Sequence, residues 1–185
     1  MKLYHYVTKG NNVLEVGLLS FCQNPKADLN YYIKRSGAKT HQGICAWMDK
    51  CFEGRSRSIR LWTTPLRWTV KSLQIKDLVD SCDLFEVDVF ALAKDGFVED
   101  VYVKPSLFDQ RYFSPADFEK FHTAGADEPL FKLNGVQDID YTYQQTWDRC
   151  DDSKGLRMGP LQYYLLVIKG GIILPKYLKR ILLLK

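Results

Sequence analysis

Within "DLFEVDVFAL", residues 83–92, Phe85, Val87 and Val89 alternate with Glu86 and Asp88, and this alternation is the strongest constraint that the sequence places on its fold. Successive side chains of a β-strand point to opposite faces, so the pattern predicts a half-buried strand. The next residues, "AKDG", have the composition of a tight turn, and "FVEDVYVKP" then alternates again. Residues 83–104 are therefore predicted to form a β-hairpin.

Three further segments have the composition of strands: residues 2–7, the run "IRLWTT" before Pro65, and the β-prone run "LQYYLLVIKG". Helices are predicted where a capping residue or helical apolar spacing occurs. They are a short helix from Asn11 or Asn12 to Gly17, and helices over 41–52, 71–81, Ser114–His122 and from Pro175 onward.

Residues 22–40 show no sustained apolar period and are predicted to be a loop with one helical turn at most, which could act as a lid. Residues 124–159 are polar and irregular, although "IDYTYQQTW" fits a strand or a helix. Strands at the beginning, middle and end, without βαβ repetition, predict an α+β fold with a mostly antiparallel sheet. With 185 residues, 46% of them hydrophobic, one domain over residues 1–185 is expected.

The sequence contains no apolar run long enough to cross a membrane, and "MKLYHYVTKG" lacks the apolar core of a signal peptide. We expect a soluble protein with no membrane partner, located in the cytoplasm or delivered into a host cytosol by a non-classical route. The cysteines are odd in number, far apart and never in a C-x-x-C pair, which is typical of reduced thiols. They are Cys22, Cys45, Cys51, Cys82 and Cys150.

No metal site is expected. His41 and Cys45 have helical i, i+4 spacing, but no second ligand pair accompanies them. The net charge of +4 is unevenly distributed, with basic residues gathered between 34 and 67 and acidic residues between 126 and 152. The basic sector favours an anionic partner, such as a phosphate-bearing ligand or nucleic acid, although each cation taken singly is also explained as solvated surface.

The opening residues "LYHYVT", an asparagine-capped short helix and then "VGLLS" resemble the N-terminal motif of the ADP-ribosyltransferase-like fold. Two later segments follow in the order that this fold has. "SIRLWTTPLRW" resembles its central strand with small hydroxyl residues, and "GPLQYYLLVIKGGIILPKYLKRI" resembles its late strand and proline-led segment. The resemblance implies a mostly antiparallel split sheet with flanking helices. It also implies NAD as the substrate, bound in a cleft beside the first strand.

The resemblance implies roles for residues of the first strand. His5 would hydrogen-bond hydroxyls of the adenosine ribose of NAD, and the backbone of Tyr6 would contact the nicotinamide amide, with Thr8 nearby. The alternatives are a satisfied histidine on a half-buried strand and a tyrosine packed in the core.

Further candidate contacts to NAD lie in the next third of the chain. The hydroxyl residues Thr63 and Thr64 follow from the resemblance, and Arg60, beside Arg55 and Arg57, could contact the pyrophosphate or a nucleic-acid backbone. In the predicted lid, two adjacent aromatic rings could stack on nicotinamide or an acceptor base, or merely pin the loop. They belong to Tyr31 and Tyr32.

The family's late-strand glutamate is absent, and the sequence has Gln162 or Tyr163 at that position, depending on a one-residue register choice. Cleavage of the bond between nicotinamide and ribose has an oxocarbenium-like transition state, which a carboxylate stabilises. Three explanations stay open: a Glu-to-Gln change at 162, a non-catalytic relative, or a carboxylate recruited from elsewhere. The candidates for recruitment are Glu99, Asp138 and Asp140.

The expected function is NAD-dependent transfer of ADP-ribose to a protein or nucleic-acid acceptor, as in a toxin or effector, with His5 and residue 162 or 163 at the catalytic position. One rival is a non-catalytic nucleic-acid- or protein-binding module on the same fold. The other is a cysteine hydrolase that pairs a cysteine with a histidine, which no local sequence favours. Its candidate residues are Cys22, Cys45, Cys150, His5, His41 and His122.

Overall fold

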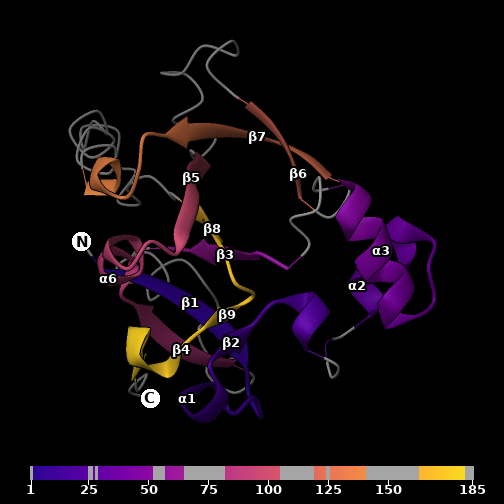
Figure 1. Cartoon of the computed structure of the whole chain (residues 1–185), viewed down its shortest axis with the longest axis horizontal. Coiled ribbons are helices and arrows are strands. Elements are labelled where there is room, and N and C mark those ends of the chain that lie inside the picture. Colours follow the sequence, from indigo (N-terminus) through magenta and orange to yellow (C-terminus); the bar gives the residue numbers. More distant parts are fainter. Residues whose placement is uncertain are drawn as a thin grey trace, which may run out of the picture.

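Two antiparallel sheets meet between the first and the third strand of the chain (Figure 1). The smaller sheet has the order β1-β4-β10, with β1 at Leu3–Thr8, β4 at Cys82–Val87 and β10 at Leu178–Ile181. The larger has the order β3-β8-β5-β7-β6. Its strands are β3 (Ile59–Thr63), β8 (Tyr163–Ile168), β5 (Val98–Lys104), β7 (Ala126–Leu133) and β6 (Glu119–Thr123).

This computed structural model describes residues 2–24, 27, 29–51, 57–64, 82–104, 119–123, 126–140 and 163–181. Short helical elements flank the sheets: α1 (Val13–Val16), η1 (Phe21–Gln23), α2 (Asn30–Ser36), α3 (His41–Cys51), α6 (Val89–Lys94) and η5 (Pro175–Tyr177). A two-stranded ladder joins β2 (Leu18–Leu19) to β9 (Ile172–Ile173). All strand pairs among the described residues are antiparallel, so the predicted α+β class with mostly antiparallel sheets is confirmed.

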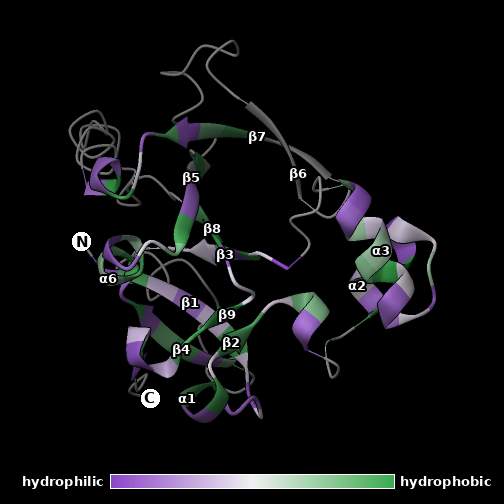
Figure 2. Cartoon of the chain, in the orientation of Figure 1, coloured by the Kyte–Doolittle hydropathy of each residue, from purple (hydrophilic) through white to green (hydrophobic). Residues whose placement is uncertain are grey.

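The buried strand β8 organises the main core. Leu166 and Ile168 point into a large cluster that also contains Leu3 of β1, while Leu165 and Val167 pack on the opposite face. Both faces of β8 are thus covered, which explains why its sequence is a nearly continuous apolar run. Figure 2 shows the same concentration of hydrophobic residues along β8 and β9.

Several local predictions are confirmed. The strands predicted at 2–7, 59–64 and 161–170 correspond to β1, β3 and β8, and the helix predicted at 41–52 corresponds to α3. The short helix α1 begins after Asn12 and ends at Gly17, whose φ of +86° suits a residue without a Cβ. The helix predicted at 71–81 lies outside the described residues.

The predicted hairpin at 83–104 is wrong. Its two strands, β4 and β5, belong to different sheets, and α6 carries the chain between them. Asp88 caps this helix by accepting a hydrogen bond from the Ala91 amide at 3.0 Å, and Val89 and Leu92 are buried beneath it. The alternation of residues 83–92 therefore continues only to Val87, where a cap and helical apolar spacing replace it.

The closing helix predicted from Pro175 is also wrong beyond its first turn. Pro175 begins the short 3₁₀ helix η5, but Leu178–Ile181 form β10, which pairs with the outer edge of β4. Pairing with β4 satisfies backbone groups that would otherwise form an open sheet edge. It also buries Tyr177 and Leu178 in the main core cluster.

Two other segments differ from expectation. The second half of the helix predicted at Ser114–His122 is wrong, because residues 119–122 belong to the edge strand β6 (Glu119–Thr123), whose backbone hydrogen bonds come from pairing with β7. Residues 114–118 lie outside the described part. The loop predicted at 22–40 contains the two-turn helix α2. Tyr32 and Ile33 pack there against Ile44 and Met48 of α3, so tertiary packing supplies the stability that a local apolar period lacks.

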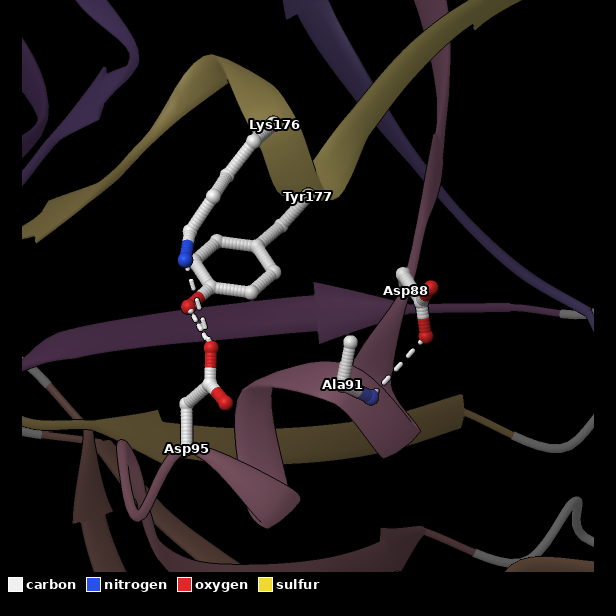
Figure 3. Close-up of polar contacts among 5 residues, drawn as sticks. All are labelled: Asp88, Ala91, Asp95, Lys176 and Tyr177. Atoms are coloured by element: carbon white, nitrogen blue, oxygen red, sulfur yellow. Dashed lines mark hydrogen bonds and ion pairs between the residues drawn. The ribbon is translucent and has the colours of Figure 1, made fainter.

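A polar clasp ties α6 to η5 (Figure 3). The Asp95 carboxylate, at the C-terminal end of α6, accepts hydrogen bonds from the Tyr177 hydroxyl and from Lys176 Nζ. The Lys176 ammonium also lies 4.6 Å from the centre of the Tyr177 ring. These contacts hold η5 in place before β10 joins the sheet, and hydrogen bonding from Tyr177 and Lys176 lowers the pKa of Asp95.

Replacing Gly17 should destabilise the fold more than replacing a glycine of similar conformation in open space. A Cβ at Gly17 would lie 2.3 Å from the carbonyl oxygen of Ile173, whereas Gly10, with φ +91°, has no atom within 4 Å of its Cβ position. We expect Gly17→Ala to lower the free energy of unfolding by about 2–4 kcal/mol and Gly10→Ala by about 1 kcal/mol. Urea unfolding measures both, and equal losses would contradict the packing of α1 on β9.

Candidate functional site

Among the described residues, the backbones of the two sheets are hydrogen-bonded to each other at one residue pair. The Tyr4 amide donates to the Thr64 carbonyl at 2.9 Å, and the Thr64 amide donates to the Tyr4 carbonyl at 3.0 Å. This bridge is isolated, so β1 and β3 do not continue as a regular ladder beyond it. The strands separate at the next residues along β1, which is where the motif histidine lies.

The side chain of His5 spans the start of this separation. Its Nδ1 lies 2.8 Å from the carbonyl oxygen of Trp62. In a continuous antiparallel ladder, the residue pair two positions beyond Tyr4 and Thr64 would be Tyr6 and Trp62, and the Trp62 carbonyl would accept from the Tyr6 amide. The His5 imidazole donates to the Trp62 carbonyl instead, so a side-chain hydrogen bond replaces a backbone hydrogen bond at the split between the sheets.

The contact with Trp62 fixes the tautomer of His5. A carbonyl can only accept, so Nδ1 must carry the hydrogen. The side chain is half-buried, and desolvation lowers the pKa of His5 below its usual value, although the hydrogen bond to Trp62 acts in the opposite direction. His5 is thus neutral at neutral pH, with a proton on Nδ1 and an acceptor lone pair on Nε2.

The backbone of Tyr6 faces the split. Because Tyr4 exchanges both backbone hydrogen bonds with β3, strand geometry directs the N–H and C=O of Tyr6 to the same side, and those of His5 toward β4. The Tyr6 side chain is half-buried on the face of Tyr4, and Thr8 is exposed at the end of β1. The side chain of His5 and the backbone N–H and C=O of Tyr6 therefore both face the split between β1 and β3.

The two hydroxyl residues at the end of β3, Thr63 within the strand and Thr64 directly after it, lie at the same place. Thr63 shares the face of His5 and is 1% exposed, and its hydroxyl donates to the Tyr164 carbonyl at 3.0 Å. Thr64 is also buried and supplies the backbone bridge to Tyr4. Both residues are brought beside the first strand, and Thr63 also joins β3 to the late strand β8.

Arg60 is not on the face of His5. It is half-buried and alternates with Leu61 along β3, so its side chain lies on the face of Trp62. Of the other two arginines singled out with it, Arg57 is exposed just before β3 and Arg55 lies outside the described residues.

Tyr32 packs within the helical cluster. The centre of its ring lies 4.5 Å from the centre of the Phe21 ring, and Tyr32 packs against Ile44 and Met48 of α3. Figure 1 places α2 and α3 together at the side of the sheets, away from β1. The backbone of Tyr31 belongs to α2, but its side chain lies outside the described part, so stacking on a ligand stays a prediction for both tyrosines.

The late strand β8 begins at Tyr163, which is 36% exposed. Tyr163 lies on the face of Leu165 and Val167, opposite to that of Tyr164 and His5. Gln162, the other candidate for the late-strand position, lies outside the described residues. Tyr163 is therefore not directed toward the face that His5 and Thr63 share.

The three candidate carboxylates lie in two places. Glu99 accepts a hydrogen bond from Ser58, at the end of β3 that is remote from Trp62. Asp138 and Asp140 flank Ile139, whose carbonyl accepts a hydrogen bond from the Tyr164 hydroxyl at 3.3 Å. The backbone between Asp138 and Asp140 therefore contacts Tyr164 of β8, whereas Glu99 contacts Ser58 before β3.

His41 and Cys45 lie close together, as their spacing suggests. Cys45 Sγ is 3.9 Å from His41 Nδ1, and His41 Nε2 donates to the Phe21 carbonyl at 2.8 Å. No group of three or more potential metal ligands occurs within the described ranges. The four cysteines in those ranges are not disulfide-bonded.

Sequence reasoning located His5 but missed its acceptor. The Trp62 carbonyl is a backbone group, and nothing in the side-chain sequence marks a carbonyl that lies 57 residues from its partner. The hydrogen bond from Tyr164 to Ile139 was missed for the same reason.

No protein-family model, curated protein or solved structure matches this chain. In the part of the chain that the structure covers, no helix is long and apolar enough to span a membrane.

The lowered pKa of His5 should make stability depend on pH. Above the unfolded-state pKa of about 6.5 both states are neutral, and below it the unfolded state takes up a proton more readily than the folded state. The free energy of unfolding should therefore fall as pH decreases from about 6.5 toward the folded-state pKa. His5→Asn keeps a hydrogen-bond donor and cannot titrate, so it should flatten this dependence in urea unfolding at a series of pH values. Identical pH profiles for both proteins would contradict the assignment.

Proposed function

We propose that the chain binds NAD at the split between β1 and β3 and transfers ADP-ribose to a macromolecular acceptor, on an ADP-ribosyltransferase-like fold. The observation that carries this proposal is the contact of His5 with the Trp62 carbonyl at the point where the sheets part. It gives the motif histidine a fixed tautomer beside a separated sheet.

Hydrogen-bond chemistry supports a ribose as the group recognised by His5. The neutral imidazole uses Nδ1–H on Trp62, and so its Nε2 can only accept. A hydroxyl is a donor that suits such an acceptor, and the ribose of the adenosine half of NAD carries two. A charged imidazole would offer no acceptor, which makes the lowered pKa of His5 part of the proposed recognition.

The Tyr6 backbone suits the nicotinamide end. A carboxamide has one carbonyl acceptor and an NH₂ donor, and it pairs with a backbone N–H and C=O that point the same way. Strand geometry directs both groups of Tyr6 toward the split. His5 and Tyr6 would then bind two parts of a single dinucleotide.

The order of the strands supports the same proposal. The strand with His5 lies beside the strand with Thr63 and Thr64, and that strand pairs with β8, the late strand. The three segments on which the sequence resemblance rests are therefore carried by neighbouring strands.

Transfer needs stabilisation of positive charge on the ribose, and we assign the late-strand position to Gln162. An amide there retains hydrogen bonding but lacks the charge that a carboxylate supplies. Asp140 would provide the charge in an active chain, because it follows Ile139, whose carbonyl contacts Tyr164, whereas the Asp138 carboxylate is bonded to the Asn134 amide in the turn after β7. We propose a protein or nucleic-acid acceptor and action in a cytosol, either the cell's own or that of a host.

Calorimetry with NAD and measurement of nicotinamide release test this proposal together. Wild-type protein should bind NAD, and His5→Asn should weaken binding about tenfold by removing the Nε2 acceptor. Gln162→Glu should raise nicotinamide release about a hundredfold. Gln42→Glu adds the same charge on an exposed residue of α3, outside the split, and should leave release unchanged.

The outcomes separate the rival functions. Binding of NAD without release from wild-type protein or Gln162→Glu would identify a non-catalytic binding module. Absence of NAD binding by folded wild-type protein would contradict the proposal altogether.

A further inference from the structure

A hollow of about 520 Å³ lies at the end of the larger sheet that is remote from His5. It is bounded by the first residues of β5, the last residues of β7 and the turn at 134–137 that follows β7. Pairing of β5 with β7 ends at Val101 and Leu133, so the hollow occupies the edge where β5 continues beyond its partner. Its volume is within the range of pockets that bind small organic molecules.

The floor of the hollow is aliphatic. Val101, Leu133 and Val136 belong to the main core cluster, and Ala93 and Val98 pack against it from α6 and β5. Packing in the core fixes the positions of these side chains, so the hollow has a rigid apolar surface. Such a surface favours the hydrocarbon part of a ligand.

The charged side chains of the lining do not balance. Asp100 and Lys132 form an ion pair at 3.0 Å, and so they neutralise each other. Glu99 accepts one hydrogen bond, from the neutral Ser58 hydroxyl. Within the described residues it forms no ion pair, and Lys169, which follows the neighbouring strand β8, is not paired with it. The lining therefore carries one carboxylate without a cation.

The turn that closes the hollow is preformed. The Asn134 amide donates to Asp138 at 3.0 Å, and Gln137 Nε2 donates to the Asn134 carbonyl at 3.3 Å. Gly135 has a φ of +153°, a conformation that favours glycine, and the Gln137 side chain lies over it. A ligand would thus meet a shaped wall, and the Asp138 carboxylate behind it adds to the negative potential.

We propose that this hollow binds an alkylguanidinium or alkylammonium group, with its short aliphatic chain on the Val98–Val101 floor and its cationic head at Glu99. Glu99 is exposed and has no cation beside it among the described residues, so a bound cation would form an ion pair with it, whereas a neutral ligand would cover part of this carboxylate without compensation. An anionic ligand would meet net negative charge. The same head group occurs on free amines or guanidines and on basic side chains of peptides.

This site is separate from the proposed NAD site. Residues at the start of β5 line the hollow, and one of them, Glu99, contacts Ser58 before the first residue of β3. The split lies beside Trp62 and Thr63, at the other end of β3. Failure of NAD binding would therefore leave this proposal standing, and failure of cation binding would leave the NAD proposal standing.

Calorimetric titration with n-butylguanidinium and its neutral isostere n-butylurea tests the proposal. Wild-type protein should bind the cation saturably and at least about fivefold more tightly than the urea, with weaker binding as salt rises. Glu99→Gln keeps an acceptor for Ser58 and should lower the affinity for the cation about fivefold. Glu15→Gln removes the same charge from exposed α1, where Glu15 accepts from Asn12, and should leave the affinity unchanged.

Amide chemical shifts locate the binding. The cation should move resonances of residues 98–101 and 134–137 in the wild-type protein, and a second titration with N-acetylargininamide compares the peptide-borne head group with the free one. Tighter binding of either form assigns the source and upholds the site. Equal affinities for the cation and the urea, equal loss in both variants, or no shifts at these residues would overturn the proposal.

Discussion

The hydrogen bond from His5 to the Trp62 carbonyl is the interaction on which the proposed site depends. It lies where β1 and β3 stop pairing, and it satisfies a backbone acceptor that a continuous sheet would have used. The half-buried Trp62 carbonyl thus avoids the free-energy cost of lacking a hydrogen bond, although β1 and β3 do not continue to pair. A single side chain thus lets two sheets join at Tyr4 and separate one residue later.

The rest of the fold keeps that junction rigid. On one side, β4 pairs with both β1 and β10, and the clasp of Asp95 with Tyr177 and Lys176 holds the segment that leads into β10. On the other side, residues 164–168 of β8 are buried and pair with the whole length of β3. His5 is therefore held between two sheets, each of which has its own backbone hydrogen bonds, and both of which pack on the same hydrophobic core.

Local sequence patterns predicted the elements that depend on local physics. Asn12 and Gly17 mark a short helix, the apolar run of β8 marks a buried strand, and both are present. The predictions failed where a distant partner decides the structure. The alternation near Val87 gave no sign that β5 would join another sheet, and the residues after Pro175 became a strand because β4 offered an open edge. At the site, the motif identified His5, but the acceptor that fixes its tautomer is a backbone carbonyl.

Nitrogen-15 NMR of histidine-labelled protein, with and without NAD, tests the central claim most directly. The geometry predicts that at neutral pH the Nδ1 of His5 carries the proton, that Nε2 is unprotonated, and that NAD shifts the Nε2 resonance while Nδ1 stays bonded to Trp62. His5→Asn assigns the signal among the three histidines. A proton on Nε2, or a His5 spectrum that saturating NAD leaves unchanged, would contradict the account.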